Sequence, residues 1–221
     1  KESCSIGIYS EDFDKNEIIN DQIDYKEGEV KINLDSRGDI EFYLFSKEDN
    51  LKVKIRKMEN NFYEGEDITE IKLFDVNNNL IFEEKIEDDG FSNSGGPETT
   101  ITEEFEIPIG KEEGLYILKI EDLSKNLDSS IGEIIINTPK IIIKDSFFSL
   151  TNQEIYTKVD KSREISFLFW NKDAIQNIEI KKENRLYKTL ELNEKKLGKK
   201  EFITLEKGEY RINTKGKVLI E

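Results

Sequence analysis

An internal repeat is the sequence feature that most limits what this chain can fold into. Residues 29–57 align with residues 154–182 at a constant offset of 125 without a gap, and seven of the 29 pairs are identical. The apolar positions match as well, as at Val30 and Ile155. A strand-rich segment that occurs twice predicts two domains of the same kind in tandem.

Short segments of alternating apolar and polar residues run through both copies. In the first copy they cover residues 30–34, 40–44 and 51–55, with polar turns between them. A period of two residues is typical of strands with one buried and one solvated face. No long segment has helical periodicity, and a half-buried sheet must cover its apolar face with another sheet. The sequence therefore predicts an all-β protein of two tandem antiparallel β-sandwich domains, Ig-like or jelly-roll-like, related by an internal repeat.

The joint between the two domains is predicted at Thr138-Pro139, because proline cannot extend the hydrogen-bond ladder of a sheet. We expect an acidic domain over residues 1–139, with a long hairpin and a loop insertion. A smaller, mildly basic domain is expected over residues 140–221. Each is large enough for a core of its own.

The pairing of the two copies after residue 57 stays open. A hairpin is predicted over residues 70–86, with its turn at Asn77–Asn79, since asparagine tolerates a positive φ. The second domain either lacks this hairpin or carries it at residues 178–192 in another register. Residues 114–118 (GLYIL) and 208–212 (GEYRI) also correspond, with glycine ending a turn and tyrosine opening a strand.

Histidine is absent and Cys4 is the single cysteine, which excludes several classes of site. A catalytic Ser-His-Asp or Cys-His arrangement, a histidine-ligated metal and an intrachain disulfide all need residues that this chain lacks. Hard cations bound by oxygen are still open. The apolar runs are too short to cross a membrane. We expect no catalysis and no membrane insertion, and we interpret the start at Lys1 as a processed or partial chain.

Three segments of the first domain resemble a known family. They are residues 73–80 (LFDVNNNL), 105–108 (FEIP) and 113–120 (EGLYILKI). They are similar to the pre-peptidase C-terminal domains and related Ig-like sandwiches of secreted prokaryotic proteins. The chain departs from the pattern at Thr69-Glu70-Ile71, where the family has acidic residues, and at Asn79, which replaces the turn glycine. The resemblance implies a non-catalytic accessory module of a secreted or cell-surface protein.

Charge is divided unevenly between the two domains. Residues 1–140 hold 35 acidic and 16 basic residues, whereas residues 141–221 hold 13 acidic and 17 basic residues. Such asymmetry bears on partners. The basic residues have no glycine-rich cradle and no interleaved aromatics, so we expect no nucleic acid. Two interpretations remain, a solvated surface or the docking of acidic first domains onto basic second domains, which would build a head-to-tail assembly.

Two stretches of oxygen ligands are candidate calcium sites, and calcium is the only cofactor that the sequence suggests. Asp12, Asp14 and Asn16 alternate as in the opening of a calcium loop, but the glycine that should follow is missing. Asp88 and Asp89 lie in the loop before Gly90. A solvated acidic loop is the alternative for both stretches.

Trp170 is the only tryptophan and a candidate ligand-binding residue, because an exposed aromatic ring can stack on a sugar. A core position or an inter-domain contact is the alternative for this side chain. Taken together, the sequence predicts a structural or adhesive module that is extracellular or on the cell surface, with protein partners or self-association. The second hypothesis is a carbohydrate-binding or calcium-stabilised accessory module of a secreted enzyme.

Overall fold

The computed structural model is almost entirely β-strand and confirms the predicted all-β class. It describes residues 5–9, 28–91, 93–110, 114–124, 128–138, 140–144, 147–149, 153–159, 161–169, 176–192, 196, 198–214 and 218–220. The predictions at Cys4, Asp12, Asp14, Asn16 and Trp170 lie outside these residues.

The chain divides into two compact units. Unit 1 comprises residues 1–4 and 14–141, and unit 2 comprises residues 5–13 and 142–221. The sequence analysis assigns residues 5–9 to the first domain, whereas strand β1 (Ser5–Tyr9) pairs with β12 of unit 2. This pair is parallel, so the expected purely antiparallel pairing does not hold at β1. Strand β10 (Lys140–Lys144) contains the point in the sequence where unit 1 ends.

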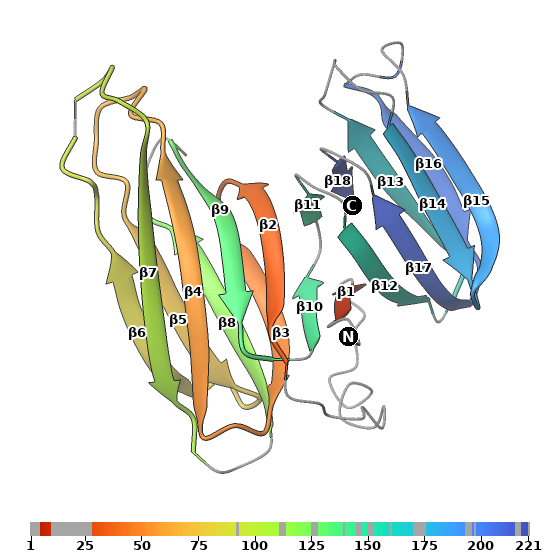
Figure 1. The fold of residues 1–221 in the computed structure, drawn as a ribbon, viewed down its shortest axis with the longest axis horizontal. Helices are drawn as coiled ribbons and strands as arrows, with labels where there is room; N and C mark the ends of the chain where they lie inside the picture. Colours follow the sequence, from red (N-terminus) through yellow and green to blue (C-terminus); the bar gives the residue numbers. More distant parts are fainter. Residues whose placement is uncertain are drawn as a thin grey trace. The chain divides into compact units, whose positions relative to one another are not determined.

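Eight strands of unit 1 lie in two sheets (Figure 1). The strands are β2 (Val30–Ser36), β3 (Ile40–Ser46), β4 (Asn50–Glu59), β5 (Thr69–Asp75), β6 (Leu80–Ile86), β7 (Thr99–Pro108), β8 (Gly114–Asp122) and β9 (Ser129–Ile136). One sheet has the order β2-β9-β4-β7, and the other has the order β3-β8-β5-β6. All pairs within these two sheets are antiparallel. Two sheets with these strand orders form a jelly roll.

Unit 2 also contains eight strands in two sheets. Strand β1 is a ninth strand, and it pairs with β12. The strands are β11 (Phe147–Ser149), β12 (Gln153–Val159), β13 (Arg163–Phe169), β14 (Gln176–Lys182), β15 (Arg185–Leu192), β16 (Lys200–Leu205), β17 (Gly208–Thr214) and β18 (Val218–Ile220). One sheet has the order β11-β18-β13-β16, and in the other β15, β14, β17 and β12 follow one another. If β2 is matched with β11, β3 with β12 and so on to β9 with β18, the two units have the same strand order.

This matching corrects the gapless alignment of residues 29–57 with 154–182, which pairs β2 with β12 instead of β11. It agrees with the alternative that matches the predicted hairpin with residues 178–192. The hairpin β5–β6 is confirmed, and its register shifts after Leu73. The hairpin β14–β15 shifts after Ile180, which is the matching residue. Descent of both units from one repeated sequence stays a prediction.

Within each of the two units, matching residues also lie opposite one another in the strand register. In unit 1, Leu118 of β8 lies opposite both Phe42 of β3 and Leu73 of β5. In unit 2, Ile212 of β17 lies opposite both Ile155 of β12 and Ile180 of β14. The tyrosines two residues earlier also correspond: the Tyr116 hydroxyl donates to the carbonyl of Ile109 at 3.5 Å, and that of Tyr210 donates to the carbonyl of Glu206 at 2.9 Å.

The apolar filling of unit 1 stops at one end of the sandwich. Along β4, alternate residues face the core, and the first three of them, Leu51, Val53 and Ile55, are fully buried. The next two inward positions are Lys57 and Glu59, which are buried as well. Buried charges need partners, so the two buried charged residues make this end of unit 1 a candidate functional site.

Candidate functional site

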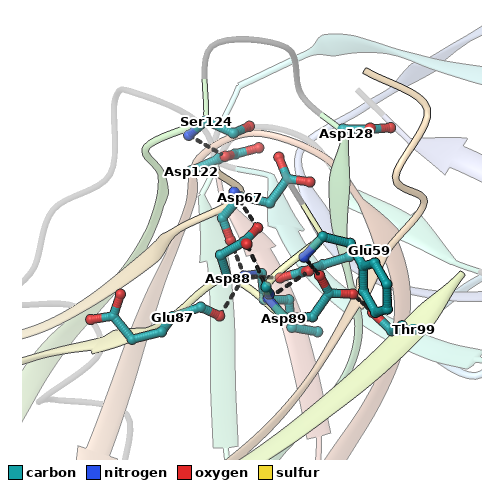
Figure 2. Close-up of polar contacts among 12 residues, drawn as sticks. Glu59, Asp67, Glu87, Asp88, Asp89, Thr99, Asp122, Ser124 and Asp128 are labelled. Carbon is teal, nitrogen blue, oxygen red and sulfur yellow. Dashed lines mark hydrogen bonds and ion pairs between the residues drawn. The ribbon is translucent and has the colours of Figure 1, made fainter. Parts of the chain in front are cut away.

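Six carboxylates gather at this end of unit 1, and they come from the ends of five strands. Glu59 ends β4, Asp67 precedes β5, Asp88 and Asp89 follow β6, Asp122 ends β8, and Asp128 precedes β9. Figure 2 shows these six side chains together with Thr99 and Ser124. Antiparallel strands bring their alternate ends to the same edge of a sandwich, which is why residues distant in sequence meet here.

Lys57 is the buried cation of this region. Its ammonium group forms an ion pair with Glu59 and donates hydrogen bonds to the backbone carbonyls of Asp67 and Glu87, the latter at 3.1 Å. The ammonium group is therefore surrounded by three oxygen acceptors, which are the Glu59 carboxylate and the two carbonyls. Burial raises the pKa of Glu59 above its ordinary value, and the hydrogen bond with Lys57 opposes that rise.

Asp88 and Asp89 are held by the turn in which they lie. Asp88 Oδ2 accepts from the amide of Gly90 at 2.9 Å, and Asp89 Oδ1 accepts from the amide of Phe91 at 2.8 Å. These are side-chain turns of the kind that aspartate favours, and Gly90 supplies a φ of 91°. Burial would raise the pKa of Asp89, but hydrogen bonds from Thr99 and Asn61 outweigh it and hold this pKa below its ordinary value.

Asn61 joins the β6–β7 loop to the end of β4. Its side-chain amide donates to Asp89 Oδ2 at 3.0 Å and to the carbonyl of Pro97 at 2.7 Å. Its own carbonyl accepts from the amides of Gly95 and Gly96. A Cβ at Gly96 would lie 3.0 Å from the Cβ of Asn61, so a side chain at this position would push the loop away. These contacts fix Asp89 beside Glu59, and the Glu59 side chain accepts from the Asp89 amide at 3.1 Å.

Glu59, Asp88 and Asp89 are the described residues whose carboxylate oxygens could hold a metal ion as they stand. One oxygen from each lies within 4.8 Å of the other two. A calcium ion with ligand distances near 2.4 Å needs oxygens at that spacing. The predicted candidates Asp88 and Asp89 are thus brought together, with Glu59 as a third carboxylate that the sequence analysis missed.

Asp67 lies between this group and a second group of polar side chains (Figure 2). It is 6% exposed. Burial raises its pKa to about 6, and the charges of Asp128, Asp122 and Asp88 act in the same direction. Its amide donates to Asp88 Oδ1 at 2.9 Å. Asp67 is therefore the carboxylate that the folded protein accommodates least well in its ionised form.

The second group lies at the connection between β8 and β9. Asp128 is 1% exposed, and its Oδ2 accepts from the amides of Phe62 and Tyr63 at 2.6 and 2.9 Å. Within the described part of the chain, its Oδ1 is buried and accepts no hydrogen bond. The same is true there of Asp122 Oδ2, and Ser124 Oγ is also buried without a partner.

Comparisons with known proteins add no family. No protein-family model matches the chain, and no curated protein matches it. Solved structures with a similar arrangement include dimeric latent PorU from Porphyromonas gingivalis, at a TM-score of 0.36 and 11% identity, over 90% of this chain and 20% of that one. A chain of the Sulfolobus Turreted Icosahedral Virus matches at a TM-score of 0.40 and 9% identity, over 90% of this chain and 60% of that one.

A third similar structure is the CUB1-EGF-CUB2 segment of human MASP-1/3, at a TM-score of 0.24 and 8% identity, over 88% of this chain and 98% of that one. At TM-scores below 0.5, these likenesses support no conclusion about this chain. The jelly-roll assignment rests on its own strand order. Among the described residues, no helix is long and apolar enough to cross a membrane.

The sequence analysis missed four of the six carboxylates and the lysine between them. Glu59, Asp67, Asp122 and Asp128 are separated by as many as 69 residues and share no motif. A signal for Lys57 and Glu59 was present, because both continue the alternation of inward-facing residues along β4. Charged residues at core positions of a strand require partners, and these two therefore pointed to the site.

We predict that Asp67→Asn stabilises the metal-free protein near pH 7.5. The pKa of Asp67 is raised from 3.8 to about 6 by folding, so ionisation of this group opposes folding. The penalty is full above pH 6, falls as the pH is lowered from 6 to 4, and is absent below 4. At pH 7.5 it amounts to about 2 to 3 kcal/mol. Urea unfolding of both proteins from pH 4 to 7.5 checks this, and a constant difference between them would contradict it.

Proposed function

We propose that this chain is a non-catalytic structural module that acts outside the cell or on its surface, where it binds further copies of itself in a larger assembly. The observation that carries this proposal is a pair of matching, exposed apolar positions on the outermost hairpin strands of the two units. Leu80 opens β6 and is 50% exposed, and Leu186 lies at the start of β15 and is 64% exposed.

These two leucines occupy the same place in matching hairpins. Leu80 lies opposite Phe74, and Leu186 lies opposite Lys181, in each case just past the register shift. Both strands end the order of their sheets. An edge strand presents unpaired backbone groups that another chain can use. Exposed apolar side chains beside such an edge favour a protein contact.

The charges around the two edges are opposite. On unit 1, β6 and its neighbour β7 carry one exposed lysine, Lys85, against five exposed glutamates, which are Glu83, Glu84, Glu103, Glu104 and Glu106. On unit 2, β15 carries exposed Arg185 and Lys188 against one exposed acid, Glu191. The β6 edge of one copy and the β15 edge of another are therefore complementary in charge, and such a contact generates a head-to-tail assembly.

The resemblance of residues 73–80 and 113–120 to pre-peptidase C-terminal domains supports an accessory role in a secreted or cell-surface protein. It also supports the absence of catalysis, since those domains accompany enzymes without acting as such. A carbohydrate-binding role depends on Trp170, which lies outside the described residues. A calcium-stabilised module is the second candidate, because six carboxylates gather at the acidic end of unit 1 and oxygens of three of them have the spacing of metal ligands.

Sedimentation velocity over a range of protein concentrations tests the assembly. We expect the chain to self-associate at low ionic strength and to dissociate as salt is added, because exposed charges are screened. Reversing two charges with Arg185→Glu and Lys188→Glu should weaken self-association by roughly tenfold. The matched control is Arg185→Lys with Lys188→Arg, which keeps both charges. A wild-type chain that stays monomeric at low salt and high concentration would rule out this contact.

A further inference from the structure

The carboxylates at the acidic end of unit 1 differ in whether the protein itself supplies their hydrogen-bond donors. Asp88 accepts from the amides of Asp67 and Gly90, and Asp89 accepts from Phe91, Asn61 and Thr99. Glu59 accepts from the amide of Asp89 and faces the ammonium group of Lys57. Each oxygen of these three side chains therefore has a donor or a cation beside it. This group is complete as it stands, although its spacing would suit a metal ion.

The neighbouring group is not complete. Asp128 Oδ1, Asp122 Oδ2 and Ser124 Oγ are buried and have no hydrogen-bond partner among the residues that the structure describes. The side chain of Asp67 is more than nine-tenths buried. Among the described residues, only the backbone groups of Asp67 take part in hydrogen bonds, not its carboxylate. Figure 2 shows this carboxylate directed toward the side on which Asp122, Ser124 and Asp128 lie.

Buried oxygens without donors are costly, and native proteins leave few of them. Here one oxygen of Asp122, one oxygen of Asp128 and the hydroxyl of Ser124 share this deficit, and they lie on the side of Asp67 away from Asp88. Lys57 does not relieve it, because its ammonium takes the backbone carbonyl of Asp67 and the side chain of Glu59. A bound cation would supply what these three oxygens lack.

We propose that Asp67, Asp122 and Asp128 bind a calcium ion, with Ser124 Oγ as an additional ligand. Calcium accepts six to eight oxygen ligands in flexible geometry, whereas magnesium demands a strict octahedron. Ligands on separate loops suit the first ion better than the second. The three carboxylates do not form a group whose oxygens lie within 4.8 Å of one another, as Glu59, Asp88 and Asp89 do. Calcium binding therefore requires these three side chains to move closer together.

Such an ion links the connection that precedes β5 to the connection between β8 and β9. Asp67 lies two residues before β5, and Asp122 and Asp128 bound the β8–β9 connection. The amides of Phe62 and Tyr63 already attach the β4–β5 connection to Asp128. Calcium binding thus joins Asp67 to Asp122 and Asp128, and it stabilises the folded chain because only the folded state holds the ligands together.

The test is isothermal titration of the full chain with calcium chloride, together with thermal melts in calcium, magnesium or chelator at fixed ionic strength. We expect one calcium ion per chain, and a melting temperature that rises with calcium and much less with magnesium. Asp67→Asn and Asp122→Asn should each weaken calcium binding by about tenfold or more, since a charged ligand is lost. Asp122→Asn keeps an oxygen for the amide of Ser124, so it should fold.

The matched control is Asp75→Asn, which removes one carboxylate charge from an exposed turn of the same unit. It should leave calcium binding unchanged. Two results would overturn the proposal. One is an absence of binding heat and of any melting shift in calcium. The other is binding that Asp89→Asn abolishes while Asp67→Asn and Asp122→Asn leave it intact, since the ion would then belong to the group of Glu59, Asp88 and Asp89.

Discussion

Replacing Lys57 with methionine should lower the free energy of unfolding by about 3 to 5 kcal/mol, the range found when one partner of a buried ion pair is removed. Lys57 and Glu59 have no exposed side-chain surface. Methionine fills similar space but leaves Glu59 without its counter-charge. It also leaves the carbonyls of Asp67 and Glu87 without a donor. Urea unfolding at pH 7.5 measures the effect.

The matched control for this substitution is Lys54→Met on the same strand. Lys54 pairs with Glu104 at 2.5 Å, but both side chains are largely exposed, and such exposed pairs contribute little to stability. The effect of Lys57→Met should shrink toward pH 5. Burial already raises the pKa of Glu59, and a protonated Glu59 no longer needs the cation. Equal losses from the two substitutions would contradict a structural role for the buried pair.

Much of the strand content could be predicted from the sequence, because a period of two residues is a local property. Residues 40–44 alternate in this way, and they lie in β3, which covers Ile40–Ser46. The hairpin predicted over residues 70–86 is present as β5 and β6. Its turn uses Asn78 with a φ of 63°, as expected for an asparagine-rich turn.

The matching of strands between the two units could not be predicted reliably, since alternation does not record which sheet a strand joins. Strands β2 and β12 have similar patterns, and a constant offset of 125 pairs them. In the structure β2 begins the order of its sheet beside β9, as β11 does beside β18. The better guide in the sequence was the match between residues 114–118 and 208–212, because Tyr116 and Tyr210 lie on matching strands. The structure adds that the two hairpins shift register at matching residues.

The candidate site was only partly visible for a different reason. Asp88 and Asp89 are adjacent and follow a strand, so a search for clustered carboxylates finds them. Asp67, Asp122 and Asp128 each stand at a separate strand end, and only the jelly-roll strand order brings them to one end of unit 1. A site assembled from strand ends becomes predictable once the topology is known, and not before.

Replacing the central phenylalanine of either unit with alanine should destabilise that unit alone. Phe42 of β3 and Phe167 of β13 are fully buried in units 1 and 2. Removing a buried phenylalanine ring costs about 3 to 5 kcal/mol, through lost burial and the cavity that remains. The chain divides into two compact units, and each has buried core residues of its own, so we expect two separate unfolding transitions.

Trp170 makes these transitions distinguishable, because it is the only tryptophan and belongs to unit 2. Its fluorescence reports on unit 2, whereas far-ultraviolet circular dichroism reports on both units. Phe167→Ala should move the fluorescence transition to a lower urea concentration. Phe42→Ala should leave the fluorescence transition in place and should lower only the urea concentration of a transition seen by circular dichroism. Phe202→Ala is the control, since that ring is 56% exposed and its loss should cost little. A fluorescence transition that moves equally with Phe42→Ala and Phe167→Ala would mean that the two jelly rolls unfold as one cooperative structure, because damage to the core of unit 1 would then be felt throughout unit 2.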